Sequence, residues 1–581
     1  MVIGDANVHA LMGGATGAGK SAAINQFLIS LLTMYPPSEL QIVYIDFKNV
    51  EAAKFTQGYL LDENKWMPLD MQKDKLKNEE YFSRFSRIPH LKIISGTTDG
   101  EYALSVFEFL MNEMSRRQRI LNKAGKMKIE ELRKDILSNY NKEHNTPKGT
   151  WRDMRQNWDW YKENVVDVYG ELPRLLILFD EFQVMFNTEF VEQKVIDMIN
   201  GKITAITKLA RAMGCHFFFT SQSMKGTMSK DTMGNFSLRG ALRCDADVSN
   251  ELLGNGAAGT IKQKFGFMYT NDSAGQNKDA NKLWRVPYLD EKDIAPYVDK
   301  LNDMLESHNE QHLMAEFYDE KVLVPATEMQ KWYKNYPEAF NDPRVFILGE
   351  RADYSENKAP ITVRLMDDTG ENFIIAAFER EDMLNLTMTM IDNIKAKENA
   401  TLIVNCQDKD TYTLLDLETI ADPRFISLAS PKQDIKEFAS AIDAMITARE
   451  SAEGELNPVY IVCIQWERAP YLSVDINYGF QDTFKDLLRR APSVGVHFIF
   501  TCKEKLDLPR PVANACNHKI GGLLTDKDSF FFINTTKVNK LPKKDDDKGL
   551  FAMYEYGNTL HKFRIYQHVY TKQLASREVV I

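Results

Sequence analysis

Residues 9–21 read HALMGGATGAGKS, and this stretch is the most informative about the fold of the first half of the chain. Within it, residues 14–21 match the phosphate-binding pattern G-x-x-x-x-G-K-[ST] in full. HALMGG is typical of a short buried strand, and the SAAINQFLISLL that follows the lysine has apolar residues at helical spacing. A strand, a glycine-rich loop and a helix in this order predict a P-loop nucleotide-binding site in an α/β fold.

The residue types of this loop fit the chemistry of phosphate binding. Glycines let the loop curl so that backbone N–H groups point at phosphate oxygens, and the start of the helix adds partial positive charge. We expect Lys20 to reach the β- and γ-phosphates of ATP, and the Ser21 hydroxyl to coordinate Mg²⁺. The predicted ATP-binding residues are Gly14, Ala15, Thr16, Gly17, Ala18, Gly19, Lys20 and Ser21.

Two further strands are expected to end at the same site. The apolar run LLILFDE at 175–181 suits a central parallel strand that is covered on both faces and ends in acid. Asp180 is predicted to hold Mg²⁺, and Glu181 to orient and deprotonate the attacking water. CHFFFTSQ at 215–222 predicts a third strand, which would place Gln222 near the γ-phosphate or the water.

Composition and charge restrict the classes of protein that fit. The chain has 581 residues, of which 44% are hydrophobic, so it is neither disordered nor a small disulfide scaffold. Its net charge of −10 disfavours a nucleic-acid partner. Six cysteines without a C-x-x-C pair predict buried free thiols in a reducing compartment. The sequence shows no transmembrane segment and no signal peptide, and we expect it to be a piece of a longer protein.

The second half of the chain repeats the first in the same order, which predicts two tandem α/β modules at 1–312 and 313–581 with largely parallel sheets. The separation of Lys20 from Asp180 is 160 residues, whereas 82 residues separate their expected counterparts Met383 and Gln465. The first module therefore carries extra residues, largely in a charged, aromatic stretch at 123–170 that we expect to be helical. The repeated segments are 372–384, 400–408, 435–450, 459–467 and 489–503.

The second module is predicted to be degenerate. Met383 replaces the lysine, and Gln465 and Trp466 supply neither a magnesium ligand nor a base, although a one-residue shift would set Glu467 opposite Glu181. Carboxylates would face the phosphates with like charge. We therefore expect no ATP hydrolysis there, and nucleotide binding in a different pose stays open. The carboxylates are Glu379, Glu381 and Asp382.

Taken together, the first half resembles the FtsK/SpoIIIE family of motor ATPases, and within it the EssC/EccC class of type VII protein secretion. The resemblance implies RecA-like modules that form hexamers, with ATP between neighbouring subunits and an arginine donated in trans. The positions that match this arginine are Arg116 and Arg117, with Arg239 and Arg243 as weaker candidates. The matching stretches are 9–21, 42–48, 89–91, 113–121, 175–181 and 208–222.

The same resemblance implies a division of labour. The second module, 313–581, would dock the tail of a secreted helical-hairpin effector, and the chain would form cytoplasmic domains of a membrane-anchored protein that works with other membrane components of the secretion system. Two other functions compete with this secretion motor. An FtsK-type DNA translocase is disfavoured by the acidic balance and the degenerate second module. A scaffold that binds nucleotide without turnover is disfavoured by the intact Glu181.

Overall fold

The computed structural model of the chain divides into two compact units, residues 1–320 and 321–581. The division falls eight residues after the expected boundary at 312, because strand β11, Phe317–Asp319, still pairs with β5 of the first sheet. The structure describes residues 3–568 except 5–6, 57–58, 63–64, 68–84, 190, 263–265, 290, 338–340, 416–424, 428–434, 469–477, 504–507, 509, 526, 528–531, 534–536 and 543–549.

The first unit is built on a nine-stranded sheet with the order β10-β9-β8-β1-β7-β6-β2-β5-β11. The strands from β8 to β11 in this order run parallel, and β9 and β10 add an antiparallel edge. Its strands are β1 (Ala10–Gly13), β2 (Leu40–Asp46), β5 (Leu91–Gly96), β6 (Arg174–Asp180), β7 (Cys215–Ser221), β8 (Leu238–Leu242), β9 (Phe267–Asn271), β10 (Lys282–Arg285) and β11, with β3 (Tyr59–Asp62) and β4 (Lys65–Met67) forming a separate pair.

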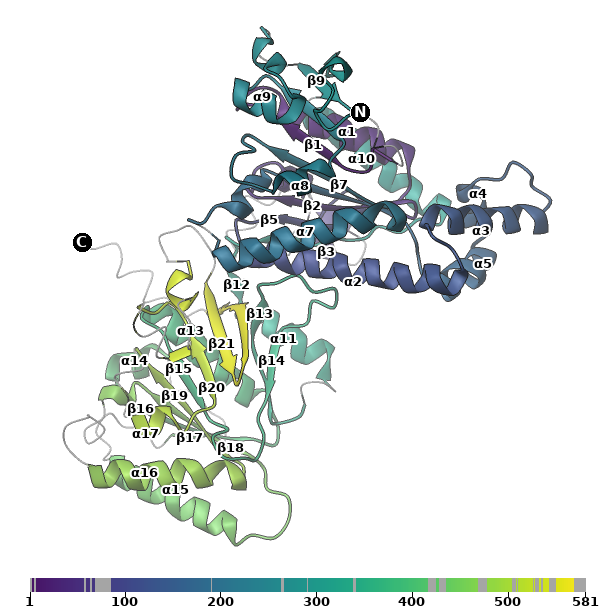
Figure 1. Cartoon of the computed structure of the whole chain (residues 1–581). Helices are drawn as coiled ribbons and strands as arrows, with labels where there is room; N and C mark the ends of the chain where they lie inside the picture. The colour runs from purple at the N-terminus through teal and green to yellow at the C-terminus, as the bar shows by residue number, and fades with distance from the viewer. Residues whose placement is uncertain are drawn as a thin grey trace. The chain divides into compact units, whose positions relative to one another are not determined.

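Helices cover both faces of this sheet (Figure 1). On one face, α1 (Lys20–Met34) and α10 (Glu291–Leu305) pack with β1 and β2 in one apolar cluster. On the other face, α2 (Gly100–Ala124) lies beside α7 (Gln193–Met213), and its Phe107 meets Phe179 and Phe217 edge-on or tilted. Burial on both faces explains why β2 and β6 read as continuous apolar runs. Two short helices follow β7 and β8: α8 (Lys230–Gly234) and α9 (Ala246–Leu253).

The extra stretch of the first unit is helical, as the sequence predicted. It continues from the end of α2 through short helices and one π-helical turn, Lys162–Val166, before β6 begins. Arg155 anchors it, because its guanidinium donates to Glu171 at 2.7 Å and to the carbonyl oxygen of Asn309 at 3.0 Å. The helices are α3 (Ile129–Glu143), α4 (Trp151–Gln156), α5 (Trp158–Tyr161) and α6 (Asp167–Tyr169).

The second unit repeats the topology of the first. Its sheet order β22-β21-β20-β15-β19-β18-β16-β17 reproduces the order from β10 to β5, and β13 and β14 extend it beyond β22. The prediction of two related α/β modules is therefore confirmed at the level of strand order. Its strands are β12 (Val324–Pro325), β13 (Val345–Arg351), β14 (Ile361–Arg364), β15 (Phe373–Ala376), β16 (Thr401–Cys406), β17 (Phe425–Ser427), β18 (Val459–Ile464), β19 (Val496–Cys502), β20 (His518–Gly521), β21 (Phe551–Tyr556), β22 (Thr559–Arg564) and β23 (Tyr566–Gln567).

Helices also cover the second sheet. On one face, α15 (Ile435–Glu450) and α16 (Tyr478–Arg490) pack with Trp466 in one apolar cluster (Figure 1). In another cluster, α13 (Arg380–Lys395) packs with β13 and β15. The six cysteines are free and buried. Among the helices of the described residues, none combines the length and apolar character needed to cross a bilayer. The helices are α11 (Ala326–Asn335), α13 (Arg380–Lys395), α14 (Lys409–Leu414), α15 (Ile435–Glu450), α16 (Tyr478–Arg490) and α17 (Arg510–Ala513).

Candidate functional site

The predicted phosphate-binding loop is the connection between β1 and α1. It spans residues 14–19, and α1 begins at Lys20. Gly19, at the start of the helix, has φ 96°, a conformation that L side chains rarely adopt. The loop is tied to the end of β8, because the N–H of Ala15 donates to the carbonyl of Arg243 at 2.9 Å. The loop thus lies at the carboxyl ends of the central parallel strands, where α/β sheets bind ligands.

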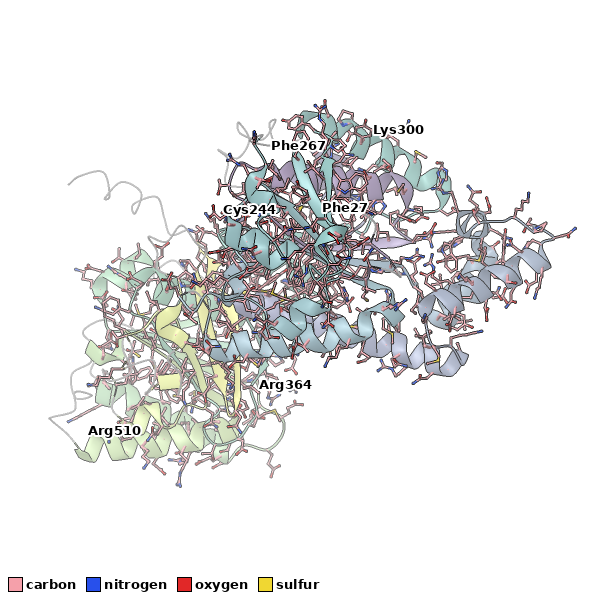
Figure 2. The ribbon with its side chains drawn as sticks, turned by 45° about the horizontal axis from the view of Figure 1, so that its top comes forward. Phe27, Cys244, Phe267, Lys300, Arg364 and Arg510 are labelled. Atoms are coloured by element: carbon pink, nitrogen blue, oxygen red, sulfur yellow. The ribbon has the colours of Figure 1, made fainter. Side chains whose placement is uncertain are left out.

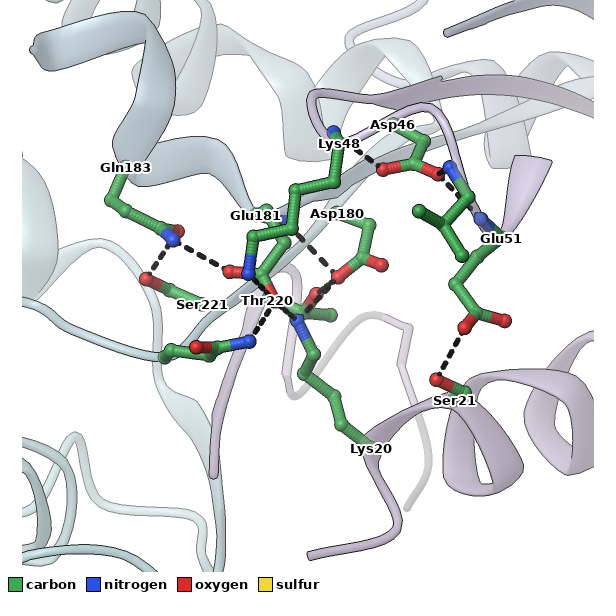
Figure 3. Close-up of polar contacts among 12 residues, drawn as sticks. Lys20, Ser21, Asp46, Lys48, Glu51, Asp180, Glu181, Gln183, Thr220 and Ser221 are labelled. Atoms are coloured by element: carbon green, nitrogen blue, oxygen red, sulfur yellow. Dashed lines mark hydrogen bonds and ion pairs between the residues drawn. The ribbon is translucent and has the colours of Figure 1, made fainter. Parts of the chain in front are cut away.

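Lys20 links the loop to the acidic end of β6 (Figure 3). Its ammonium donates to Asp180 at 2.8 Å and also to Glu181, and the side chain is only 9% exposed. The two motifs that the sequence placed 160 residues apart therefore converge in one site, as predicted. A single buried lysine neutralises part of the charge of two buried carboxylates, which would otherwise be costly to bury together.

Asp180 is buried, and burial disfavours the ionised form of its carboxyl group. Burial raises its pKa above the usual value, although Lys20 and the hydroxyl of Thr220 stabilise the carboxylate. Thr220 lies on the neighbouring strand β7 and donates to the same carboxylate oxygen that Lys20 contacts. The carboxylate is thus held rigidly at the end of β6 by groups from the loop and from β7.

Glu181 follows β6 with a left-handed backbone, φ 54°. Burial alone would raise its pKa, but the charge and hydrogen bond of Lys20, with help from Gln183 and Lys48, lower the pKa below the ordinary value. The side-chain amide of Gln183 donates to Glu181 at 2.5 Å, and Lys48 lies 3.2 Å from it. Glu181 is therefore an ionised carboxylate at neutral pH, which is the state that a general base requires.

Gln222 joins this carboxylate to the loop. Its amide nitrogen donates to Glu181 at 2.9 Å, and its carbonyl oxygen accepts from the hydroxyl of Thr16 at 3.1 Å. The structure brings Gln222 to the sheet edge that the sequence predicted, beside the base and the loop. Its contact with a γ-phosphate or with water stays a prediction.

A turn after β2 also reaches the site, which the sequence analysis did not foresee. The carboxylate of Glu51 accepts a hydrogen bond from the hydroxyl of Ser21 at 2.8 Å. Asp46, the last residue of β2, holds this turn because its carboxylate accepts hydrogen bonds from four backbone N–H groups, those of residues 48, 50, 51 and 52, at 2.6 to 3.2 Å. Strand β2 ends beside β6, so polar residues just after it were the signal that could have revealed Lys48 and Glu51.

Ser21 and Asp180, the predicted magnesium ligands, line one pocket together with the loop. A serine hydroxyl and a carboxylate are oxygen donors of the kind that Mg²⁺ binds, usually with one or two carboxylates and with substrate phosphates. The donor set therefore fits the ion. Bound there, Mg²⁺ would neutralise charge on the β- and γ-phosphates.

This pocket has a volume of about 1080 Å³, which is large enough for a nucleotide. Its lining includes the loop and the charged side chains described above. It also includes residues around β9 and β10, across β1 from β7 and β6 in the sheet order, that the sequence analysis missed: Gly266, Phe267, Arg285, Val286, Pro287, Tyr288 and Leu289.

The expected trans arginines on α2 have structural partners within the first unit. Arg117 is fully buried and donates to the carbonyl of Met213 at 2.7 Å and to Glu113 at 2.7 Å. Arg116 donates to the carboxylate of Glu113. It also donates to the carbonyl oxygens of Tyr169 and Glu171, each at 3.1 Å. In this structure the guanidinium of Arg117 is buried within its own unit, and its role as a trans arginine stays a prediction. Arg116 joins α2 to the segment before β6.

The weaker arginine candidates lie nearer to the loop. Arg239, on β8, is 7% exposed, and its guanidinium donates to the carbonyls of Phe236, Met233 and Glu251. Arg243 follows β8 and contacts the loop through its backbone carbonyl. The guanidinium of Arg239 thus forms its hydrogen bonds within its own unit. The assignment of a trans arginine stays a prediction.

The second unit can be aligned to this site by its backbone hydrogen bonds. The N–H of Phe47 donates to the carbonyl of Asp180 at 3.1 Å, and the N–H of Gln407 donates to that of Ile464 at 3.0 Å. The residue after each strand, Glu181 or Gln465, has φ 54° or 53°. Ile464 therefore stands where Asp180 stands, and Gln465 where Glu181 stands, one residue from the predicted pairing of Gln465 with Asp180.

The loop of the second unit is also shorter than the sequence suggested. Three residues, 377–379, connect β15 to α13, whereas six connect β1 to α1. The first helical residue, equivalent to Lys20, is consequently Arg380 rather than Met383, which is 2% exposed and packs in the core. The described residues of this edge therefore include no counterpart of the glycine-rich loop, of Lys20 or of the Asp180–Glu181 pair.

A buried threonine of the second unit also differs from its counterpart in the first unit, because the acidic residue that would accept its hydrogen bond is absent. Thr501 on β19 corresponds to Thr220 on β7, because their strands pair equivalently with β18 and β6. Thr220 donates to Asp180, whereas the hydroxyl of Thr501 finds no hydrogen-bond partner among the described residues. With Ile464 in place of an aspartate, the acceptor is missing.

Sequence comparison connects this geometry to a family. The FtsK/SpoIIIE family model matches the first unit. The match covers residues 2–57 and 77–225, which include the loop, β6 and Gln222. The resemblance expected from the sequence is confirmed.

Curated relatives match in part of their length. The ESX-5 secretion system protein EccC5 of Mycobacterium marinum is 24% identical over 281 residues, 48% of this chain and 16% of the relative. The DNA translocase FtsK of Rickettsia typhi is 27% identical over 216 residues, 37% of this chain and 24% of the relative. The chain therefore spans about a quarter or less of the length of these relatives.

Solved structures show the fold of the whole chain. The cytoplasmic domain of the type VII secretion ATPase EccC from Thermomonospora curvata has a TM-score of 0.62 at 16% identity, covering 98% of this chain and 62% of that one. EssC (ATPases 2 and 3) from Geobacillus thermodenitrificans has a TM-score of 0.54 at 13% identity, covering 97% and 92%. The chain thus shares the fold of these tandem ATPase domains, as the sequence predicted.

Proposed function

We propose that this chain is the ATP-hydrolysing motor segment of a type VII protein secretion machine. The first unit binds ATP with Mg²⁺ and hydrolyses it, and the second unit recognises helical effector proteins. The observation that carries this proposal is the convergence of Lys20, Asp180 and Glu181 in one pocket, set against Ile464 and Gln465 at the equivalent edge of the second unit.

The contacts within the first site suggest how hydrolysis proceeds. Phosphate oxygens held by the loop attract the ammonium of Lys20, which frees the carboxylate of Glu181. Glu181 then takes a proton from water as the water oxygen attacks the γ-phosphorus, and the bond to the bridging oxygen breaks to give ADP and phosphate. Gln222 orients the water, because its amide touches both Glu181 and Thr16.

For the second unit, we propose a role in docking rather than in catalysis. A structure of Thermomonospora curvata EccC (ATPases 2 and 3) in complex with a signal sequence peptide has a TM-score of 0.54 to this chain at 12% identity, covering 96% of this chain and 88% of that one. We infer that residues 321–581 bind the tail of a secreted helical-hairpin effector through spaced apolar anchors. Assembly into a hexamer, membrane anchoring in the longer protein and other membrane components of the machine belong to this proposal.

A DNA translocase is the second candidate, because several curated relatives carry the name DNA translocase FtsK. One experiment separates the two: solution mass, ATP binding and ATP turnover of the full chain, measured alone, with effector tail peptides and with duplex DNA. Peptide binding that raises turnover or mass supports the secretion motor. Stimulation by DNA, without peptide binding, supports the translocase, and absence of ATP binding overturns both.

A further inference from the structure

The large pocket in the first unit is lined by the phosphate-binding loop and also by residues around β9 and β10, which lie on the other side of β1 from β7, β6 and β2 in the sheet order. We propose that Tyr288 and Phe267, from this second part of the lining, form the subsite that binds the nucleobase. This inference rests on the proposed function, since it assigns the base of the same nucleotide whose phosphates the loop would hold.

The two aromatic residues come from segments that the fold holds together. Phe267, labelled in Figure 2, begins strand β9, and Tyr288 lies three residues after the end of β10. The N–H of Val286 donates to the carbonyl of Gly266 at 2.9 Å, and β9 and β10 are paired directly. Both aromatic residues line the pocket that also contains Lys20 and Ser21.

The segment around Tyr288 is anchored on both sides of that residue. Val286 and Leu289 pack against the apolar cluster that contains α1 and α10, which fixes the backbone. Tyr288 itself is 75% exposed and has no comparable packing to lose. Its ring can therefore stack on an incoming base without giving up contacts with the core.

The lining of the pocket has two parts of different chemical character, as a nucleotide requires. The part around the loop carries Lys20, Lys48, Glu51 and three more acidic groups, whereas the part around β9 and β10, apart from Arg285, is apolar or aromatic. A triphosphate matches the charged part, and a planar base matches the aromatic part. Stacking tolerates any base, so this subsite would strengthen binding of nucleoside triphosphates without selecting adenine strictly.

The test compares ATP with inorganic tripolyphosphate, which has the phosphates without the nucleoside. Binding of each to the full chain is measured by calorimetry with Mg²⁺, for the natural chain and for Tyr288→Ala. We expect the substitution to weaken ATP binding about 5- to 100-fold, the range of one base–aromatic stacking contact, and to leave tripolyphosphate binding unchanged. Tyr288→Phe should restore ATP binding, because it keeps the ring.

A matched control is Tyr297→Ala, which removes a half-exposed tyrosine of α10 that does not line the pocket. It should leave both affinities unchanged. Equal ATP affinity for Tyr288→Ala and the natural chain overturns the nucleobase subsite while leaving the proposed function standing. Failure of the natural chain to bind either ligand overturns the proposed function together with the subsite.

Discussion

Glu181 and Gln465 stand at the same backbone position in their two units, each directly after a buried central strand, with φ 54° and 53°. A left-handed conformation at a residue other than glycine costs roughly 1 to 3 kcal/mol and is usually retained at functional sites. The second unit has kept this backbone, while the carboxylate has become an amide. The chemistry of this edge has thus diverged while its backbone geometry has not.

The first prediction concerns Glu181 itself. Glu181→Gln keeps the size of the side chain and one acceptor oxygen, so it can keep one of the two hydrogen bonds that Gln183 and Gln222 donate to separate carboxylate oxygens. It removes the base, so ATP turnover should fall about 10²- to 10⁴-fold. Nucleotide binding should persist, because the loop and Lys20 are unchanged. Phosphate release and calorimetric binding measure the two quantities. Gln465→Ala in the second unit serves as the control with unaltered turnover, and full activity of Glu181→Gln would remove Glu181 from its role.

The second prediction locates hydrolysis within the chain. Lys20→Ala removes the ammonium that contacts both carboxylates, and turnover of the full chain should disappear although the second unit is intact. Arg380→Ala, at the equivalent start of α13, should leave turnover unchanged. Phosphate release by each variant is compared with that of the natural chain. Magnesium-dependent turnover that survives in Lys20→Ala would show that the second unit hydrolyses ATP.

Much of the site followed from the sequence because it depends on local patterns. The loop 14–21 is a contiguous motif, and the strands before Asp180 and Gln222 are apolar runs that end in polar residues. Parallel strands place such ends at one edge of a sheet, so their convergence could be inferred without coordinates. The repeated order of segments likewise predicted the shared topology of the two units.

Other features of the two units could not be predicted from the sequence, because they depend on loop length and on burial. The loop of the second unit is three residues shorter than that of the first, and an alignment without gaps therefore placed Met383 at the lysine position. Arg117 has the residue type of a trans arginine, and only the packing of α2 against α7 shows that it is buried. The polar residues after β2 point to this edge of the sheet, but only the fold of the turn shows that Glu51 contacts Ser21.

The third prediction tests the structural role of the arginine pair on α2. Burial opposes the charge of Glu113, but its hydrogen bonds and charge pairs with Arg116 and Arg117 lower its pKa to about 2. A folded pKa below the unfolded value of 4.5 means that the carboxylate stabilises the fold above pH 4.5, and that this contribution is lost as the pH falls toward 2.

Glu113→Gln should therefore lower the free energy of unfolding at pH 7, by up to about 3 kcal/mol, and by much less near pH 2. Urea unfolding at both pH values measures the difference. Glu108→Gln on the same helix is the matched control, since its carboxylate is 57% exposed and lies 3.6 Å from Lys202. A destabilisation by Glu113→Gln that is equally large at pH 2 would contradict the charge-based explanation.

The last prediction compares two threonines at equivalent positions. Thr220→Val removes the hydroxyl that donates to the buried Asp180 and should destabilise the first unit by about 1 to 3 kcal/mol, because a charged acceptor loses its partner. Thr501→Val removes a buried hydroxyl without a partner among the described residues, so it should leave the second unit equally stable or more stable. Thermal or urea unfolding of each full-length variant gives the two values. Equal losses from both substitutions would mean that Thr501 has an acceptor after all, and that the edge next to Ile464 has kept a polar function.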